Sequence, residues 1–110
     1  MVLQDAALDE VFHALADPTR RAMLRSLAGA ERNITELAAP FRMSFAAASK
    51  HVRVLEAAGL VRRRIEGRSH LCRLDPEPLA AADQWLRHYE RLWMGGLERL
   101  DEILKEDVDR

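Results

Sequence analysis

The chain has 110 residues, of which 48% are apolar and 32% are charged, and its formal net charge is −1 at pH 7. This length suits one small domain with its own core, and no apolar run reaches the roughly 18 residues of a membrane-spanning helix. The N-terminal stretch lacks the basic start and apolar centre of a signal peptide, and the single cysteine, Cys72, cannot form an internal disulfide. We therefore expect one domain over residues 1–110, located in the cytoplasm and without a membrane partner.

Charge is distributed unevenly along the chain. Residues 1–41 carry a net charge of −2, residues 42–74 carry +6 and residues 75–110 carry −5. A run of charged residues is ordinarily a solvated face. Here, however, the basic residues gather in one segment and an acidic segment follows, which favours a polyanion bound by that middle region alone.

Two amphipathic helices are predicted in the first 29 residues. The first spans residues 8–16, where apolar side chains recur at helical spacing at Leu8, Val11, Phe12 and Leu15. The second begins at Pro18 after a capping Asp17 and ends at Gly29. Its inward face includes Met23, Leu24 and Leu27.

Residues 33–58 are predicted to form two helices joined by a short turn. Asn33 and Glu36 have the spacing of a capping box, and Pro40 limits the first of these helices to about two turns. Ser44 caps a longer helix that ends before Gly59. This arrangement is typical of a helix-turn-helix.

The longer helix has two distinct faces. Its inward face is formed by Ala48, Val52 and Leu55, and a second face carries Ala46, Ser49, Lys50 and Arg53. Small residues let a helix approach a surface closely, while the hydroxyl and the two cations donate hydrogen bonds. The pattern indicates a helix that enters the major groove of double-stranded DNA, although an ordinary helical hairpin would also explain this segment.

Residues 60–74 are predicted to form a β-hairpin that turns at Glu66-Gly67. The alternation of strand side chains puts Val61, Arg63 and Ile65 on one face and Arg62 and Arg64 on the other, with Arg68 at the tip. An isolated two-stranded hairpin is unstable, so this one must lean on the preceding helices. Its arginines would then reach phosphates beside the recognition helix, which describes a winged helix-turn-helix.

The C-terminal segment predicts a long helix over residues 78–105. Its near-heptad apolar stripe consists of Leu79, Ala82, Leu86, Tyr89, Trp93, Leu100 and Ile103, and Trp85 and Leu92 widen it. So wide a stripe favours pairing between two copies over packing within one domain. We expect helices 8–16 and 78–105 to form the dimer interface through Leu8, Val11, Phe12, Leu15, Leu86, Tyr89, Trp93 and Leu100. Gly95-Gly96 is placed to kink or split the second of these helices.

Three stretches, "ALADPTRR", "SKHVRVLEAAGLV" and "EGR…RLDP", resemble the ArsR/SmtB family of bacterial winged-helix repressors over roughly residues 8–93. The resemblance implies a homodimeric repressor that binds an inverted-repeat operator, frequently its own promoter, and so lies on the nucleoid when bound. By motif position it places at the DNA Ser44, Phe45, Ala47, Ser49, Lys50 and His51 of the recognition helix and Arg62, Arg64 and Arg68 of the wing. Arg53 joins this set through the helix face described above.

Departures from the family pattern concern Phe45 and the metal ligands. Relatives usually carry a polar residue at the position of Phe45, whose ring could pack on a thymine methyl or cover the turn. Metal-sensing members carry ligands at the third helix or on the last helix. Residues 36–41 contain no cysteine or histidine, and Asp83 and His88 lie five apart, off a common helix face. We expect no metal and no cofactor, and no residue identifies an inducer.

Isolated side chains offer little further chemistry. His13 and His70 have the pattern of packed or surface histidines, and Cys72 shares its strand face with Leu74, as expected of a partly buried, inert thiol. No phosphate-cradling glycine loop, nucleophile with a base, or apolar carboxylate pair indicates an enzyme. Two alternatives stay open: a module whose last helix binds a different protein, and a metal- or redox-responsive regulator with a non-standard site.

Overall fold

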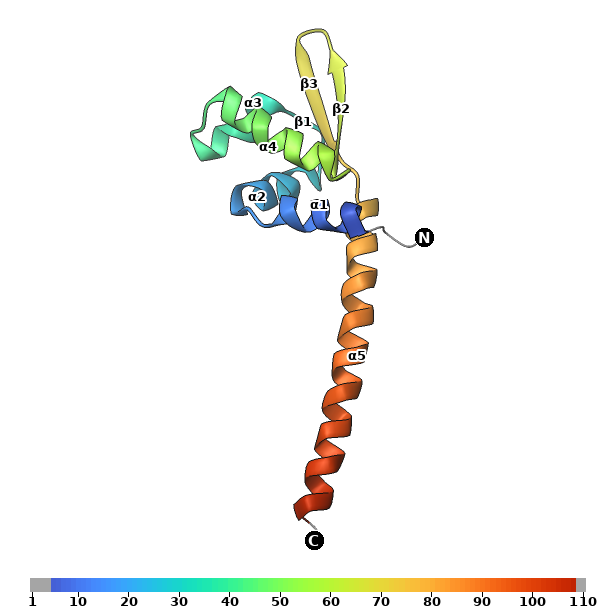
Figure 1. The fold of residues 1–110 in the computed structure, drawn as a ribbon. Helices are drawn as coiled ribbons and strands as arrows, with labels where there is room; N and C mark the ends of the chain where they lie inside the picture. The colour runs from blue at the N-terminus through green and yellow to red at the C-terminus, as the bar shows by residue number, and fades with distance from the viewer. Residues whose placement is uncertain (1–4, 109–110) are drawn as a thin grey trace.

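The computed structural model describes residues 5–108 and confirms the winged helix-turn-helix architecture. In chain order the elements are α1 (Asp5–Leu15), α2 (Pro18–Leu27), β1 (Arg32–Asn33), α3 (Ile34–Ala38), the 3-10 turn η1 (Ala39–Phe41), α4 (Phe45–Ala57), β2 (Val61–Glu66), β3 (Ser69–Leu74) and α5 (Glu77–Val108). The strands form an antiparallel sheet in the order β1-β3-β2. Figure 1 shows α1 to α4 gathered beside this sheet and α5 leading away from both.

Three helices start where their capping residues were predicted. The side-chain oxygens of Asp17, Asn33 and Ser44 each accept a hydrogen bond from the backbone N–H three residues on, at 3.0, 2.8 and 3.1 Å. At Asn33 the capping box is complete, because Glu36 accepts in return from the backbone N–H of Asn33 at 3.0 Å. These bonds satisfy backbone donors that a helix start leaves open, so the predicted helix boundaries have a local cause.

The turn within the helix-turn-helix is made without glycine. Arg42 adopts the left-handed conformation, with φ of 53°. A glycine does lie at the other end of α4, where Gly59 has φ of 76° and its backbone N–H donates to the carbonyl of Glu56 at 2.9 Å. A Cβ at Gly59 would lie 3.3 Å from Cγ of Pro78, so this position also lets the start of α5 approach closely.

The core lies between the four short helices and the inner face of the sheet. Its large, fully buried side chains are Met23, Ile34, Leu37, Leu55, Leu60, Val11, Val52 and Cys72. The predicted inward faces of α2 and α4 are confirmed. The prediction that Leu8 and Val11 lie at the dimer interface is wrong. Both side chains are buried in the core of their own chain and are not available to a second copy. The stripe of α1 faces α2, α4 and α5, and only Phe12 and Leu15 at its border are half-exposed.

The sheet differs from the sequence prediction in two ways. Glu66 pairs with Ser69, so the hairpin loop is Gly67-Arg68, one residue later than predicted, and Gly67 has φ of 62°. A positive φ at the first loop residue is what a type II′ hairpin turn requires, and glycine supplies it. The sheet also has a third strand, β1, whose Arg32 pairs with Cys72. Its two residues are too few to leave an alternating pattern in the sequence.

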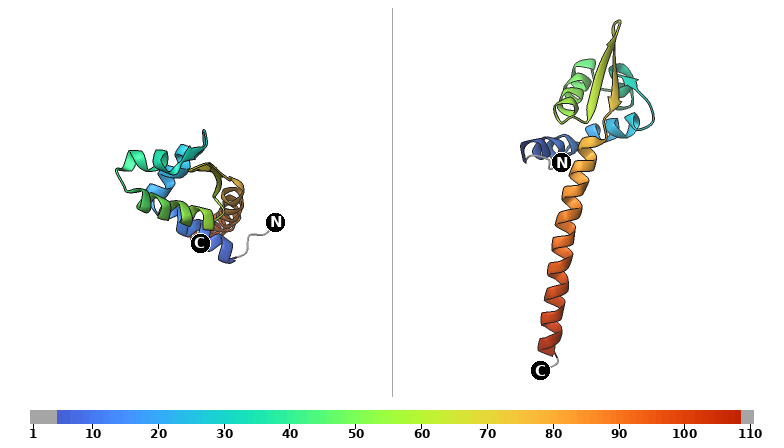
Figure 2. Two further views of the ribbon diagram at one scale, coloured as in Figure 1. Left: turned by 90° about the horizontal axis from the view of Figure 1, so that it is seen from above. Right: turned by 90° about the vertical axis from the view of Figure 1, so that its right-hand side faces the viewer.

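Helix α5 is one continuous element of 32 residues and projects from the head, which comprises residues 5–74 with the first turns of α5. The right-hand view of Figure 2 shows it leaving the head, with no other described element beside its far half. The molecule accordingly measures 75 × 31 × 23 Å. Gly95 and Gly96 do not interrupt α5, so the predicted split of this helix is wrong. None of the helices within residues 5–108 is long and apolar enough to span a membrane.

Candidate nucleic-acid interface

The outward face of α4 is small, cationic and open. Phe45, Ala46, Ala47, Ser49, Lys50 and Arg53 line a shallow hollow along it. Lys50 and Arg53 are exposed, and neither has a carboxylate partner within residues 6–106, whose side chains the structure describes. The Phe45 ring is 56% exposed and shares a second hollow with Arg42 and Met43 of the turn. It therefore adjoins the turn and is still available to a partner.

Ser49 and His51 lie differently from the other recognition-helix residues. Ser49 is only 7% exposed, which argues against the predicted base contact. The His51 ring points back toward α2, where its Nδ1 is 4.0 Å from Oδ2 of Asp17. At about 100° per residue, Ser49 and His51 flank the buried stripe of Ala48, Val52 and Leu55 on its two opposite borders, so each turns partly toward the helical core.

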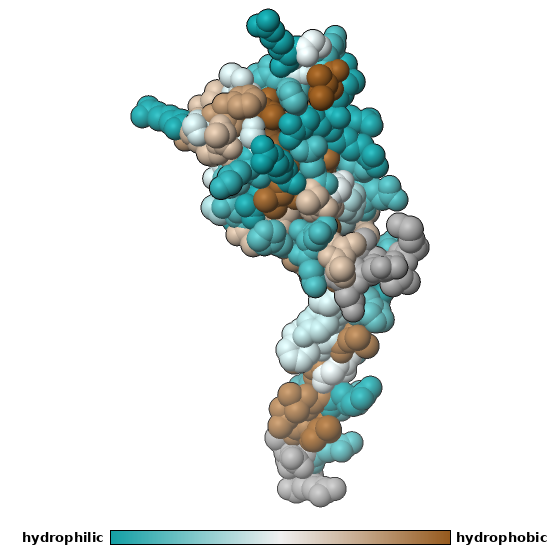
Figure 3. All heavy atoms as spheres, turned by 45° about the horizontal axis from the view of Figure 1, so that its top comes forward, coloured by the Kyte–Doolittle hydropathy of each residue, from teal (hydrophilic) through white to brown (hydrophobic). Residues whose placement is uncertain are grey.

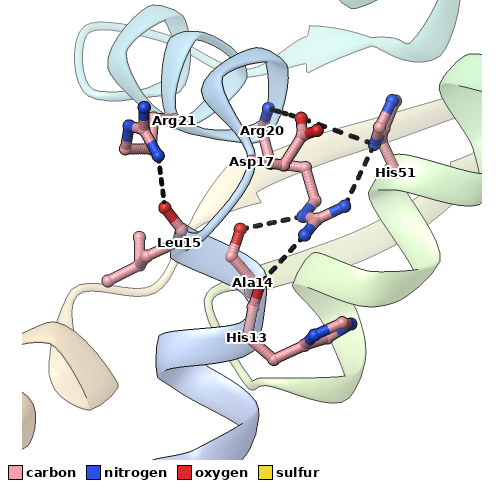
Figure 4. Close-up of polar contacts among 7 residues, drawn as sticks. All are labelled: His13, Ala14, Leu15, Asp17, Arg20, Arg21 and His51. Atoms are coloured by element: carbon pink, nitrogen blue, oxygen red, sulfur yellow. Dashed lines mark hydrogen bonds and ion pairs between the residues drawn. The ribbon is translucent and has the colours of Figure 1, made fainter.

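Arg20 connects three helices at this junction (Figure 4). Its Nε and one terminal nitrogen donate to the carbonyls of Ala14 and His13 at the end of α1, each at 2.8 Å. Its other terminal nitrogen lies 3.4 Å from Nδ1 of His51 on α4. A helix end leaves carbonyls without intrahelical partners, and a guanidinium satisfies them with charge-assisted bonds. Arg20 therefore fixes α4 relative to α1. This residue lies in the "ADPTRR" stretch, but its role in joining the helices was not predicted from the sequence.

Asp17 completes this junction electrostatically. The backbone N–H of Arg20 is the main cause that lowers the pKa of the Asp17 carboxyl, and the charges of Arg20 and His51 lower it further. The nearby Arg21 donates to the carbonyl of Leu15 at 2.7 Å, so a second arginine holds the end of α1.

The wing arginines are less free than their sequence suggests. Arg62 Nε donates to Oδ2 of Asp75 at 2.9 Å. Arg64 donates through one terminal nitrogen to Glu66 at 2.6 Å and through the other to Glu31 at 3.1 Å. Both bonds raise the pKa of the Arg64 guanidinium, the bond to Glu66 more than the bond to Glu31. A phosphate would have to compete with these carboxylates.

Arg68 and Arg73 complete the charge on the wing. Arg68 lies in the exposed loop and has no carboxylate partner within the described side chains. Arg73 is exposed and pairs directly with Arg62 across the strands, so the two like charges share the outer face. Like charges in this position are unfavourable on their own. The second strand's alternation could have identified Arg73 from sequence, but it was not singled out.

The inner side of the hairpin holds a second, more enclosed network. Arg63 donates to Glu56 at the end of α4, and another of its nitrogens lies 3.0 Å from Nδ1 of His70. Cys72 is fully buried, and that burial raises the pKa of its thiol. A raised pKa disfavours the reactive thiolate, which argues against a thiol switch. Among the described residues, no group of three or more His, Cys, Asp and Glu side chains could hold a metal ion.

A second surface of possible function runs along α5. Leu86, Tyr89, Trp93 and Leu100 are each between 48% and 62% exposed. Their neighbours continue the apolar surface, which is visible as brown side chains along the projecting helix in Figure 3. Phe12 packs edge-on against Trp85 with ring centroids 5.9 Å apart, and Trp85 stacks on Tyr89 at 5.6 Å. Aromatic packing thus links α1 to the exposed stripe.

Comparisons with known proteins agree with this geometry. A family model described as a helix-turn-helix domain matches residues 15–64. The HTH-type transcriptional regulator Rv2034 of Mycobacterium tuberculosis is 36% identical over 101 residues, which is 92% of this chain and 92% of that protein. A crystal structure of an ArsR family transcriptional regulator, RHA00566, has a TM-score of 0.80 and 38% identity, covering 86% of this chain and 97% of that one.

A solution structure offers a further likeness. It is the homodimeric winged helix-turn-helix DNA-binding domain of Mb0332 from Mycobacterium bovis, described as a possible ArsR-family regulator. Its TM-score is 0.59 with 27% identity, and the match covers 88% of this chain and 84% of that one.

Proposed function

Since this chain belongs to the ArsR/SmtB family of winged helix-turn-helix transcriptional regulators, we propose that it binds an inverted-repeat operator as a homodimer and represses its own or an adjacent operon. The family consists of DNA-binding regulators, so the chain is not an enzyme. We place the protein in the cytoplasm, on the nucleoid when DNA-bound.

The open cationic face of α4 carries this proposal. Lys50 and Arg53 are exposed there without carboxylate partners in the described part of the chain, beside small residues that allow close approach. Lysine binds guanine edges in the major groove, and both cations bind phosphates. We assign base reading to Lys50 and Phe45, close approach to Ala47, and phosphate contact to Arg53.

The wing extends the contact beyond α4. Arg68 has no carboxylate partner within the described side chains, so binding a phosphate through it displaces no internal ion pair. Arg62 and Arg64 are exposed but paired, and they would exchange a carboxylate for a phosphate. We therefore rank Arg68 above Arg62 and Arg64 as a contributor to affinity. The N-cap Ser44 remains a proposed contact at the start of the helix.

Dimerisation is supported by the apolar stripe of α5. Four exposed residues, Leu86, Tyr89, Trp93 and Leu100, would be covered by a second copy. Mb0332, similar in fold, is described as homodimeric. A two-fold dimer would present its two recognition helices to half-sites about one helical turn, roughly 34 Å, apart. Occupying such a site in a promoter would exclude the polymerase, which is sufficient for repression.

Fluorescence anisotropy with the protein's own promoter duplex tests the proposal. We expect tight binding of two protomers per site, weak binding to a scrambled duplex, and a steep loss of affinity with added salt because phosphate contacts release counterions. Lys50→Ala should weaken promoter binding by about 1–3 kcal/mol and reduce the preference over the scrambled duplex.

Arg25→Gln is the matched control, because it removes a charge from the exposed end of α2, outside the proposed interface. Its affinity should equal that of the wild type. Equal, weak binding of wild-type protein to promoter and scrambled duplex would contradict the proposal that the operator lies in its own promoter. If a panel of adjacent intergenic duplexes also gave only weak binding, operator recognition itself would be wrong.

A further inference from the structure

Glu31 makes an ion pair across the fold that is not explained by helix or strand formation. Its carboxylate accepts from Arg64 at 3.1 Å across 33 positions of sequence. Glu31 precedes β1, whereas Arg64 lies in the middle of β2. The contact therefore joins the segment before β1 to a wing arginine, unlike the pair between Arg64 and Glu66, which lies within one strand.

Glu31 is placed among several arginines. A hollow on the wing is lined by Glu31 together with Arg62, Arg63, Arg64 and Arg73. The strand register puts Arg62 opposite Arg73 on the outer face, and Arg64 follows two residues further along the same face. Glu31 is the acidic residue of this hollow, so its charge offsets repulsion among cations that would otherwise attract a polyanion.

We propose that Glu31 is a built-in competitor of DNA: it occupies Arg64 in the free protein and thereby limits the affinity of the wing for phosphate. This inference rests on the proposed function, because the polyanion is operator DNA. A carboxylate and a phosphate oxygen bind a guanidinium through the same donors. The Arg64 nitrogen that bonds Glu31 can therefore donate to that carboxylate or to a DNA phosphate, but it cannot bind both at full strength.

The exposure of the pair makes this exchange possible. The Arg64 side chain is 54% exposed and that of Glu31 is 41% exposed. Ion pairs at such exposed sites contribute little net stability, so a phosphate can displace the acid at low cost. Removing the acid should accordingly raise DNA affinity by about two- to fivefold.

Glu31→Gln is the decisive variant, because it keeps the side-chain shape and removes the charge. We expect tighter promoter binding in the anisotropy titration together with a slightly lower Tm, since the arginines then repel one another more. If the role of Glu31 were purely structural, Glu31→Gln would lower both the promoter affinity and the Tm. Glu98→Gln, on the far half of α5, removes the same charge away from the wing and should leave affinity unchanged.

Introducing Glu31→Gln into an Arg64→Gln variant tests whether the gain in promoter affinity acts through Arg64. If Glu31 acts by withholding Arg64, the gain from Glu31→Gln disappears when Arg64 is already absent. Three results would overturn the inference: unchanged affinity in Glu31→Gln, an equal gain in Glu98→Gln, or a gain that persists in the Arg64→Gln background.

The two proposals fail in distinguishable ways. Wild-type protein that binds no operator duplex overturns both. Wild-type protein that binds its operator and loses affinity on Arg68→Gln, while Glu31→Gln binds no more tightly than wild type, leaves the proposed function intact and rejects the role of Glu31.

Discussion

At the scale of single residues, the junction of α1, α2 and α4 shows how one motif serves several elements. Asp17 caps α2, and Arg20 both donates its backbone N–H to that cap and uses its side chain to hold the carboxyl end of α1. His51 brings α4 to the same place. A mutation here would disturb DNA binding through the orientation of the recognition helix and not through a lost DNA contact.

Asp17 predicts a specific dependence of stability on pH. Folding lowers the pKa of its carboxyl, chiefly through the backbone N–H of Arg20. The stability that this provides is fully present above about pH 5 and is lost as the pH falls through the lowered pKa. Asp17→Asn keeps a capping side chain without the charge. In thermal unfolding, wild type should exceed Asp17→Asn in Tm at neutral pH, and the gap should close as the pH falls below the lowered pKa of Asp17. A gap that is constant with pH would exclude this linkage.

At the scale of elements, the two glycines with positive φ make the joints between helix, wing and α5. Gly59 ends α4 and Gly67 makes the hairpin loop. Neighbouring atoms differ between the two positions: an added Cβ at Gly59 meets Pro78, whereas one at Gly67 meets nothing within 4 Å. Gly59 is therefore needed both for its positive φ and for the space beside Pro78. Gly67 is needed only for its positive φ.

Alanine substitutions at these positions should separate the two requirements. Gly67→Ala should cost about 1–2 kcal/mol of unfolding free energy, the cost of left-handed backbone in a non-glycine residue. Gly59→Ala should cost more, because Pro78 must also move. Gly95→Ala, in the interior of α5 with open space around it, should instead stabilise the chain by about 0.5–1 kcal/mol. Urea unfolding measures all three, and equal losses at Gly59 and Gly67 would remove the packing argument.

At the scale of the whole molecule, the shape favours a partner. Helix α5 has 32 residues and packs on the head through its first turns, beside α1. Its far half continues with exposed residues such as Leu100 and Ile103. Isolated helices in water are marginal, and an exposed apolar stripe of this length is unfavourable. A second copy would stabilise the far half of α5 and cover its apolar stripe. It would also place two recognition helices on one duplex.

Leu100→Glu tests this assembly without touching the head. We expect the variant to be monomeric in sedimentation equilibrium, to lose helicity in circular dichroism, and to bind a half-site much more weakly than the wild type binds the full operator. Arg91→Gln is the control, since nine residues or two and a half turns put Arg91 on the opposite side of α5. A Leu100→Glu protein that remains dimeric would show that the far half of α5 is not part of the interface.

The local features of this protein were determined by sequence alone. Helix starts at Asp17, Asn33 and Ser44 follow from hydrogen bonds that reach only three residues along the chain. The faces of α4 and of the hairpin follow from periodicity, which is likewise a property of neighbouring residues. The same local information located the cationic segment and the apolar stripe of α5.

Tertiary structure alone decided which of those faces stayed free. The sequence could not show that Val11 is buried in its own core, that His51 turns toward Asp17, or that Arg64 is held by Glu31. Each of these depends on which distant side chains meet, and Arg64 and Glu31 are 33 residues apart. Local pattern identifies which residues are able to bind DNA, but packing and ion pairing decide which of them are available to it.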